Sequence, residues 1–164
     1  MTTREGGDCR REFFAILPRA SATTPLYVHE PLDTTKRQIR LLEIRRGGAQ
    51  VEFSIVVQDG DTSSPYRPPV ETAYWALSYV WGPPTPTYNI LIDGKRFPIR
   101  ANLYHFLQNY LRFPVPPPWG GEADVALGED RLWIDQICID QSNLQERTTK
   151  SNKCVGYTRI VQQF

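Results

Sequence analysis

The sequence predicts a single α/β domain with a partly parallel sheet and a β-hairpin near its N-terminus. Two strand patterns joined by glycines, at 38–44 and 51–58, predict the hairpin. An amphipathic helix pattern at 102–112 lies between two apolar strand patterns, at 74–80 and 131–135. If these two strands paired in parallel, helices would cover both faces of the sheet there. That would explain why neither strand alternates cleanly between apolar and polar residues.

Length and composition favour one globular domain. The chain has 164 residues, 40% of them hydrophobic and 23% charged, which is enough for one core. A net charge of +1 gives no reason to expect nucleic acid or an anionic membrane as partner. No apolar run reaches the roughly 18 residues that a membrane span needs. We therefore expect a cytoplasmic chain.

Metal and cofactor motifs are absent from the sequence. Its three cysteines form no C-x-x-C pair, and its two histidines, His29 and His105, lie far apart in the chain. No P-loop and no G-x-G-x-x-G motif is present. We expect neither a metal nor a cofactor. Cys138 is expected to be a small buried residue, because no base stands near it in the pattern.

The N-terminal half is expected to begin with a flexible leader over residues 1–24, which are polar and irregular, and to become ordered from residue 25. In the predicted hairpin, Gly47-Gly48 marks the turn, and Val51, Phe53 and Ile55 alternate with more polar residues. These alternating apolar side chains should face the core.

The next strand, "YWALSYV" (74–80), is rich in aromatic residues and ends at Gly82-Pro83-Pro84. Leu77 and Val80 are the residues expected in the core. A second hairpin follows over 88–100, with Asp93-Gly94 as a two-residue turn.

The helix predicted at 102–112 has Asn102 as its N-cap. Its apolar face consists of Leu103, Phe106, Leu107, Tyr110 and Leu111. Residues 113–130 form a long loop rich in proline and glycine. The strand that starts at residue 131 carries Trp133, expected in the core. Ser142 and Gln145 then show a capping-box pattern that begins a short helix.

Polar side chains gather where the two central strands end. Ser78, Trp81 and Gly82 follow the first strand, and Asp135 follows the second. In open α/β sheets, ligands bind outside the carboxyl ends of the strands. Asp135 could act as a general base or hold a sugar hydroxyl, or it could cap a loop or pair with an arginine.

Two further charged residues have alternative interpretations. Glu146 near the start of the last helix is either a capping carboxylate favoured by the helix dipole or a functional acid. Arg147 beside it is either a surface charge or a contact for an anion.

Three stretches form a recognisable set: "YWALSYVWG" (74–82), the hairpin and helix over 88–112, and "RLWIDQICIDQSNLQER" (131–147). In order and spacing they closely resemble the blocks of the fungal heterokaryon incompatibility (HET) domain. The resemblance implies a signalling module that acts in non-self recognition and programmed cell death, through self-association or protein partners.

The resemblance also implies a fold related to the TIR domain, a flavodoxin-like α/β sheet. Some TIR domains cleave NAD with a glutamate, which makes an NAD(P) glycohydrolase the alternative function and NAD a candidate substrate. In that alternative, Glu146 and Asp135 would be catalytic. Ser78, Trp81, Gly82 and Arg147 would bind the ligand.

The C-terminal sequence departs from the family pattern after Glu146-Arg147. The family continues with a helix and then a strand, whereas "TTKSNKCVGYTRIVQQF" keeps only an echo of that pattern. We therefore expect residues 25–164 to form an incomplete HET-like domain that lacks this strand. A sheet edge left exposed in this way raises the alternative of an inactive copy.

Overall fold

The computed structural model describes residues 17, 20–33, 35–36, 38–46, 50–59, 74–112, 129–151 and 159–162. The predicted Gly47-Gly48 turn, residues 113–128 of the predicted loop and most of the predicted leader lie outside these residues. Within the leader range, Leu17 is buried in the core, and the Thr24 carbonyl accepts a hydrogen bond from the Arg96 side chain.

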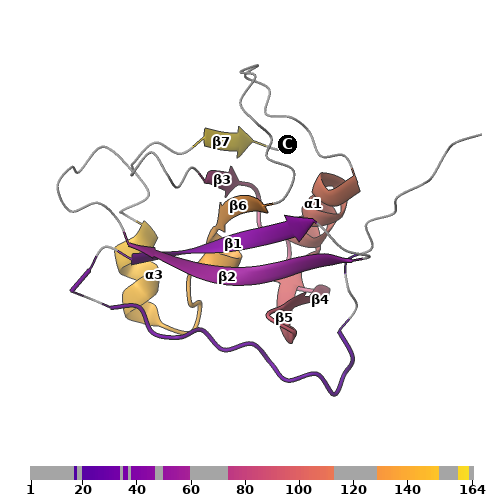
Figure 1. The fold of residues 1–164 in the computed structure, drawn as a ribbon, viewed down its shortest axis with the longest axis horizontal. Coiled ribbons are helices and arrows are strands. Elements are labelled where there is room, and N and C mark those ends of the chain that lie inside the picture. The colour runs from indigo at the N-terminus through magenta and orange to yellow at the C-terminus, as the bar shows by residue number, and fades with distance from the viewer. Residues whose placement is uncertain are drawn as a thin grey trace, which may run out of the picture.

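A five-stranded mixed sheet forms the centre of the molecule, in the order β2-β1-β6-β3-β7 (Figure 1). The predicted N-terminal hairpin is confirmed, because β1 (Gln38–Arg46) pairs antiparallel with β2 (Val51–Asp59). On its other side β1 pairs antiparallel with β6 (Glu129–Ile134), and β6 pairs parallel with β3 (Trp75–Ser78). The architecture is therefore mixed α/β, as predicted.

The predicted parallel pairing of the two central strands is confirmed. Ala76 lies opposite Trp133, and Leu77 lies opposite Ile134. Ala76, Leu77 and Ile134 are buried, whereas Trp133 is half-buried at the margin of the core. The prediction that Val80 belongs to the core is wrong, because β3 ends at Ser78 and the Val80 side chain is 73% exposed.

The predicted second hairpin is also confirmed. It consists of β4 (Thr87–Ile92) and β5 (Lys95–Arg100), joined by Asp93 and Gly94 with φ of 50° and 70°. Positive φ at both central residues is the geometry that favours an Asp-Gly turn. The Asp93 N–H donates to the Phe53 carbonyl of β2, so the turn docks this hairpin onto the outer strand of the sheet.

Helix α1 (Ala101–Arg112) packs its apolar face into the core, as its periodicity predicts. The predicted N-cap role of Asn102 is wrong, because the helix begins at Ala101. The Asn102 side-chain amide instead donates to the Val80 carbonyl at 2.9 Å. The buried residues of this face are Leu103, Phe106, Leu107 and Leu111.

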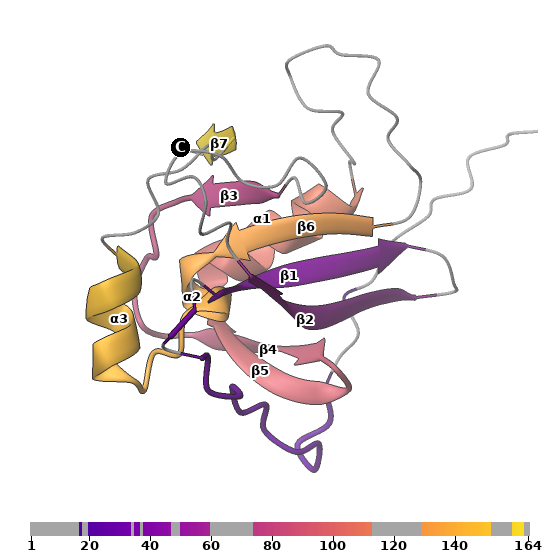
Figure 2. The same cartoon turned by 60° about the vertical axis from the view of Figure 1, so that its left-hand side comes forward.

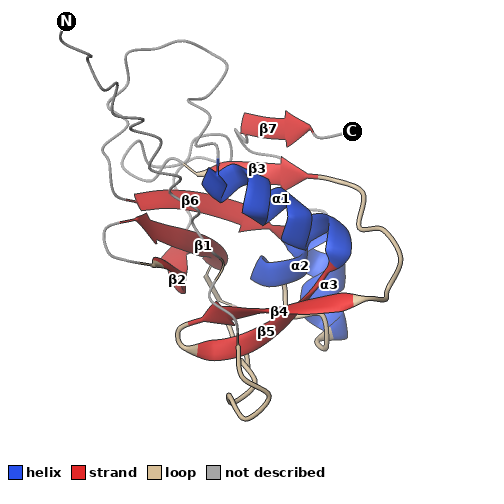
Figure 3. Ribbon diagram, turned by 90° about the vertical axis from the view of Figure 1, so that its right-hand side faces the viewer, coloured by secondary structure: helices blue, strands red, loops and turns tan. Residues whose placement is uncertain are grey.

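Two shorter helices follow β6. The single turn α2 (Asp135–Cys138) lies between β6 and the β4–β5 hairpin (Figure 3). Helix α3 (Leu144–Ser151) stands to one side of the sheet (Figure 2). Among the described residues, no helix has the length and apolarity to cross a membrane.

The expectation that no strand follows the last helix is wrong. Strand β7 (Arg159–Gln162) pairs parallel with β3, with Trp75 opposite Arg159 and Ser78 opposite Gln162. This strand covers the edge of β3 that would otherwise be open, so the sheet has a third parallel strand.

Candidate functional site

The carboxyl ends of β3 and β6 bring Trp81 and Asp135 together. The Trp81 indole Nε1–H donates to Asp135 Oδ2 at 2.6 Å, and the Gln136 backbone N–H donates to Asp135 Oδ1 at 2.7 Å. Burial raises the pKa of Asp135, although both hydrogen bonds favour the charged form. The predicted neighbours therefore meet, and each oxygen of the carboxylate already accepts an internal hydrogen bond.

An arginine that the sequence did not single out completes this cluster. The Arg100 guanidinium lies 4.8 Å from the centre of the Trp81 ring and donates to the Gly82 carbonyl at 2.8 Å. This geometry combines a cation–π contact with a backbone hydrogen bond. Arg100 is the last residue of β5, and nothing local in the sequence shows that the hairpin reaches the end of β3.

Gly82 has a structural reason to be glycine. Its φ is +71°, and a Cβ at this position would lie 2.8 Å from the side-chain nitrogen of Asn102. Gly82 therefore lets the chain turn beside the start of α1, where the Asn102 amide holds the Val80 carbonyl.

Two other predicted site residues, Ser78 and Arg147, are exposed and are not part of the Trp81–Asp135 contact. Ser78 is exposed at the end of β3, and Arg147 is exposed on α3. Within the described part of the chain, no hydrogen bond or ion pair joins either side chain to Asp135. Whether Ser78 or Arg147 contacts a ligand stays a prediction.

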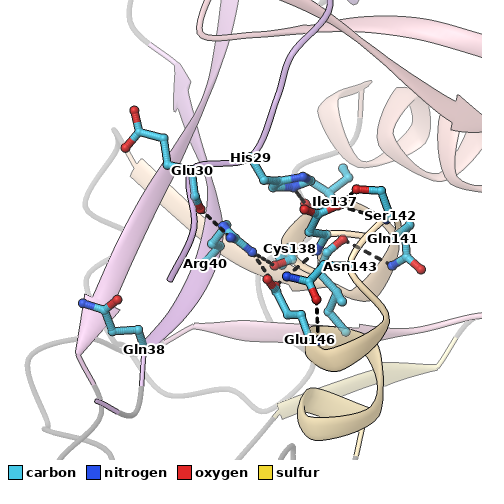
Figure 4. Close-up of polar contacts among 12 residues, drawn as sticks. His29, Glu30, Gln38, Arg40, Ile137, Cys138, Gln141, Ser142, Asn143 and Glu146 are labelled. Carbon is cyan, nitrogen blue, oxygen red and sulfur yellow. Dashed lines mark hydrogen bonds and ion pairs between the residues drawn. The ribbon is translucent and has the colours of Figure 1, made fainter. Parts of the chain in front are cut away.

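Glu146 forms a buried ion pair with Arg40 of β1 (Figure 4). The Arg40 side chain is 1% exposed and the Glu146 side chain 9% exposed. Glu146 Oε1 also accepts the Asp140 backbone N–H at 3.2 Å. This carboxylate is therefore engaged on the inner side of α3, as expected of a structural carboxylate.

Arg40 connects two further segments to this ion pair. Its guanidinium donates to the Glu30 carbonyl at 2.6 Å and to the Cys138 carbonyl at 3.3 Å, besides Glu146. Glu30 belongs to the extended N-terminal segment, and Cys138 ends α2. Sequence reasoning missed Arg40, because its position within a strand shows no partner 106 residues away.

The turn before α3 explains how Glu146 is oriented. The Asn143 side chain accepts the Glu146 N–H at 3.1 Å, so Asn143 is the N-cap and the predicted cap at Ser142 is wrong. Ser142 instead donates to Asp140 Oδ1 from its hydroxyl at 2.6 Å and its N–H at 2.9 Å. Burial would raise the pKa of Asp140, but these hydrogen bonds, together with the nearby His29 and Arg40, outweigh it and lower the pKa.

The two clusters are linked through the backbone of the third signature block. The Gln141 side-chain amide donates to the Asp135 carbonyl at 2.8 Å. The His29 ring nitrogen Nε2 lies 2.7 Å from the Ile137 carbonyl. Cys138 is buried as predicted, and burial raises the pKa of its thiol to about 12, which keeps it protonated.

The Asp135 and Glu146 carboxylates both accept hydrogen bonds from groups of the protein itself. Asp135 accepts from Trp81 and a backbone N–H, and Glu146 accepts from Arg40 and a backbone N–H. Among the described residues, no group of His, Cys, Asp and Glu side chains could hold a metal ion. The arrangement resembles a polar scaffold more than an open acid/base pair.

Comparisons with known proteins agree with the motif resemblance. The family model described as heterokaryon incompatibility protein (HET) matches residues 74–155, half of the 164-residue chain. Heterokaryon incompatibility protein 6, OR allele, of Neurospora crassa is 35% identical over 99 residues. That match covers 52% of this chain but only 12% of the relative's length. No solved structure matches.

Proposed function

Because this chain belongs to the heterokaryon incompatibility family, we propose that it acts as a signalling and interaction module in fungal non-self recognition. Its output is the programmed cell death that follows the fusion of incompatible cells. It acts through protein partners or through self-association. The chain spans about 12% of the Neurospora relative, so the proposal concerns the module and not a complete protein.

The observation that carries this proposal is the internal use of the signature residues. Trp81 of the first block holds Asp135 of the third, and Glu146 of the third block is held by Arg40. A general acid or nucleophile needs an oxygen that faces its substrate. Carboxylates that instead bind their own fold support a role in shaping a contact surface.

Induced expression of the chain in hyphae of a filamentous fungus tests the proposal. We expect expression to raise the fraction of hyphal compartments that take up a vital dye excluded by living cells. The matched control is Leu77→Asp, which places a charge at a core position only 5% exposed and should unfold the domain. An equal rise with the control would contradict the proposal. A folded wild-type chain that leaves hyphae viable would favour the inactive copy.

One observation favours the alternative of a TIR-like NAD(P) glycohydrolase. Asp135, whose pKa is raised by burial, and the exposed Ser78 both stand at the carboxyl ends of parallel strands, where flavodoxin-like folds bind ligands. This reading would require Glu146 to leave Arg40 in order to meet a substrate. The interaction module requires no such rearrangement, and we favour it for this reason.

A further inference from the structure

We propose that Arg40 is the positioning residue of helix α3, and that its ion pair with Glu146 is the latch that holds the end of the third signature block on the sheet. Arg40 lies outside residues 74–155, the part of the chain that the family model matches. That this ion pair attaches α3 to the sheet is independent of the proposed function. Only the effect of the latch on signalling rests on the proposed function.

The inner end of the latch is a fixed point of the fold. Arg40 is the third residue of β1, between Ile39 and the fully buried Leu41, and its own side chain is almost fully buried. Its guanidinium is fixed by the carbonyls of Glu30 and Cys138 before it reaches Glu146. A cation held in this way presents a preformed site for one carboxylate.

The outer end of the latch is the inward-facing side chain of α3. Among residues 144–148, whose side chains the structure describes, only Glu146 is not exposed, and Leu144 is 71% exposed. The Thr148 hydroxyl donates to the Leu144 carbonyl of the same helix at 2.7 Å. In this part of α3, the described inward attachment is therefore ionic rather than apolar.

Loss of the latch should act locally. A helix attached by apolar burial resists the loss of one charge, whereas a short polar helix does not remain docked without its partner. The core around β1 and β6 is built from apolar side chains that do not depend on Glu146. We therefore expect α3 to open separately from the sheet when the ion pair is removed.

Residue-resolved hydrogen exchange on the full chain tests this inference. The variant is Glu146→Gln, which keeps the shape of the side chain and removes its charge. We expect the amides of residues 146–148, and the Asp140 amide that donates to Glu146, to exchange at least about tenfold faster. The amides of Leu42 and Ile44 in β1 should keep their wild-type rates.

The matched control is Asp59→Asn. It removes the same charge from the exposed Lys36–Asp59 ion pair, whose side chains are 55% and 59% exposed, and should leave α3 unchanged. The inference would be overturned if α3 of the Glu146→Gln variant exchanged at the wild-type rate. It would also be overturned if exchange accelerated equally in α3 and β1.

Two further variants keep the inference testable if Glu146→Gln does not fold. Arg40→Lys keeps the charge but loses the branched guanidinium, so α3 should exchange at an intermediate rate. Arg40→Met combined with Glu146→Gln leaves no unpaired buried charge. In this double variant, global stability should recover while α3 still exchanges fast. If global stability and slow exchange in α3 both recovered, the ion pair would be merely structural and the inference would be overturned.

The dye assay in hyphae separates this inference from the proposed function. If α3 must be docked for signalling, Glu146→Gln should lower the fraction of dying compartments several-fold, and Asp59→Asn should not. A wild-type chain without any response would contradict the proposed function but leave the exchange result standing. Fast exchange in α3 with an undiminished response would overturn the functional consequence of the latch.

Discussion

The pKa of Asp135 is set by two opposing effects. The position of Asp135 after β6 places it beside the Trp81 indole N–H and the Gln136 backbone N–H, which both favour the charged form. Burial favours the neutral form and is the larger effect, so the pKa is raised. This balance makes Asp135 the residue whose environment is most readily tested by pH.

We expect Asp135→Asn to alter the pH dependence of stability. The folded state keeps the Asp135 proton at pH values where the unfolded carboxyl, with a reference pKa of 3.8, has lost it. Between 3.8 and the raised pKa, the contribution of this carboxyl to stability therefore falls as the pH rises. Urea unfolding at a series of pH values should show this fall in the wild type but not in the variant.

Asp140 provides a control of opposite sign. Its pKa is lowered, so its contribution is present above the unfolded value and is lost as the pH falls through the folded one. The wild type should therefore lose stability at acidic pH as Asp140 is protonated, and the Asp140→Asn variant should lack this part of the loss. The proposed environments would be contradicted if the difference curves of the two variants sloped in the same direction.

At the scale of elements, the junction between β3 and α1 is built around Gly82. The chain leaves the strand, turns at a positive φ and passes close to the Asn102 side chain. The Asn102 amide and the Arg100 guanidinium then bind two successive parts of this turn, the carbonyls of Val80 and Gly82. These contacts fix where Trp81 stands relative to Asp135.

Gly82→Ala and Gly94→Ala form a matched pair that tests this junction. Their φ values are +71° and +70°, but a Cβ at Gly94 would meet nothing within 4 Å. Both variants should lose about 1–2 kcal/mol of unfolding free energy from backbone strain. Gly82→Ala should lose about 1 kcal/mol more, because Asn102 must leave the Val80 carbonyl. Equal losses in chemical denaturation would show that the Asn102 contact contributes nothing.

Much of the element order could be predicted because it depends on local patterns. The Asp93-Gly94 turn, the apolar face of α1 and the parallel partners β3 and β6 all follow from spacing and composition. The one-turn helix α2 was not predicted, because four residues are too few to show a helical period. The cap at Asn143 was assigned one residue too early, since Ser142 shows an equally good pattern.

At the scale of the whole molecule, the long-range partners of the candidate site could not be read from the sequence. Trp81 and Asp135 were placed together because parallel strands share one edge of a sheet. Arg40 reaches Glu146 across 106 residues, and Arg100 reaches the Trp81 ring from a separate hairpin. Such contacts depend on how the elements pack, and no local period encodes them.

The mixed sheet also contains strands that lie outside the region matched by the family model. Strands β1 and β2 lie before residue 74, yet β1 borders β6 and supplies Arg40. Strand β7 closes the edge beside β3 after the matched region ends. We therefore infer that the smallest useful fragment for experiments includes β1 as well as the signature blocks.

Release of nicotinamide from NAD by the purified chain is the most direct test of whether the signature carboxylates serve the fold or a reaction. We expect no release above a protein-free blank, under conditions where an active TIR enzyme cleaves NAD, because Asp135 and Glu146 bind internal donors. Asp59→Asn serves as the charge-matched control. Release by the wild type and by Asp59→Asn, but not by a folded Glu146→Gln variant, would contradict the interaction module and establish an enzyme.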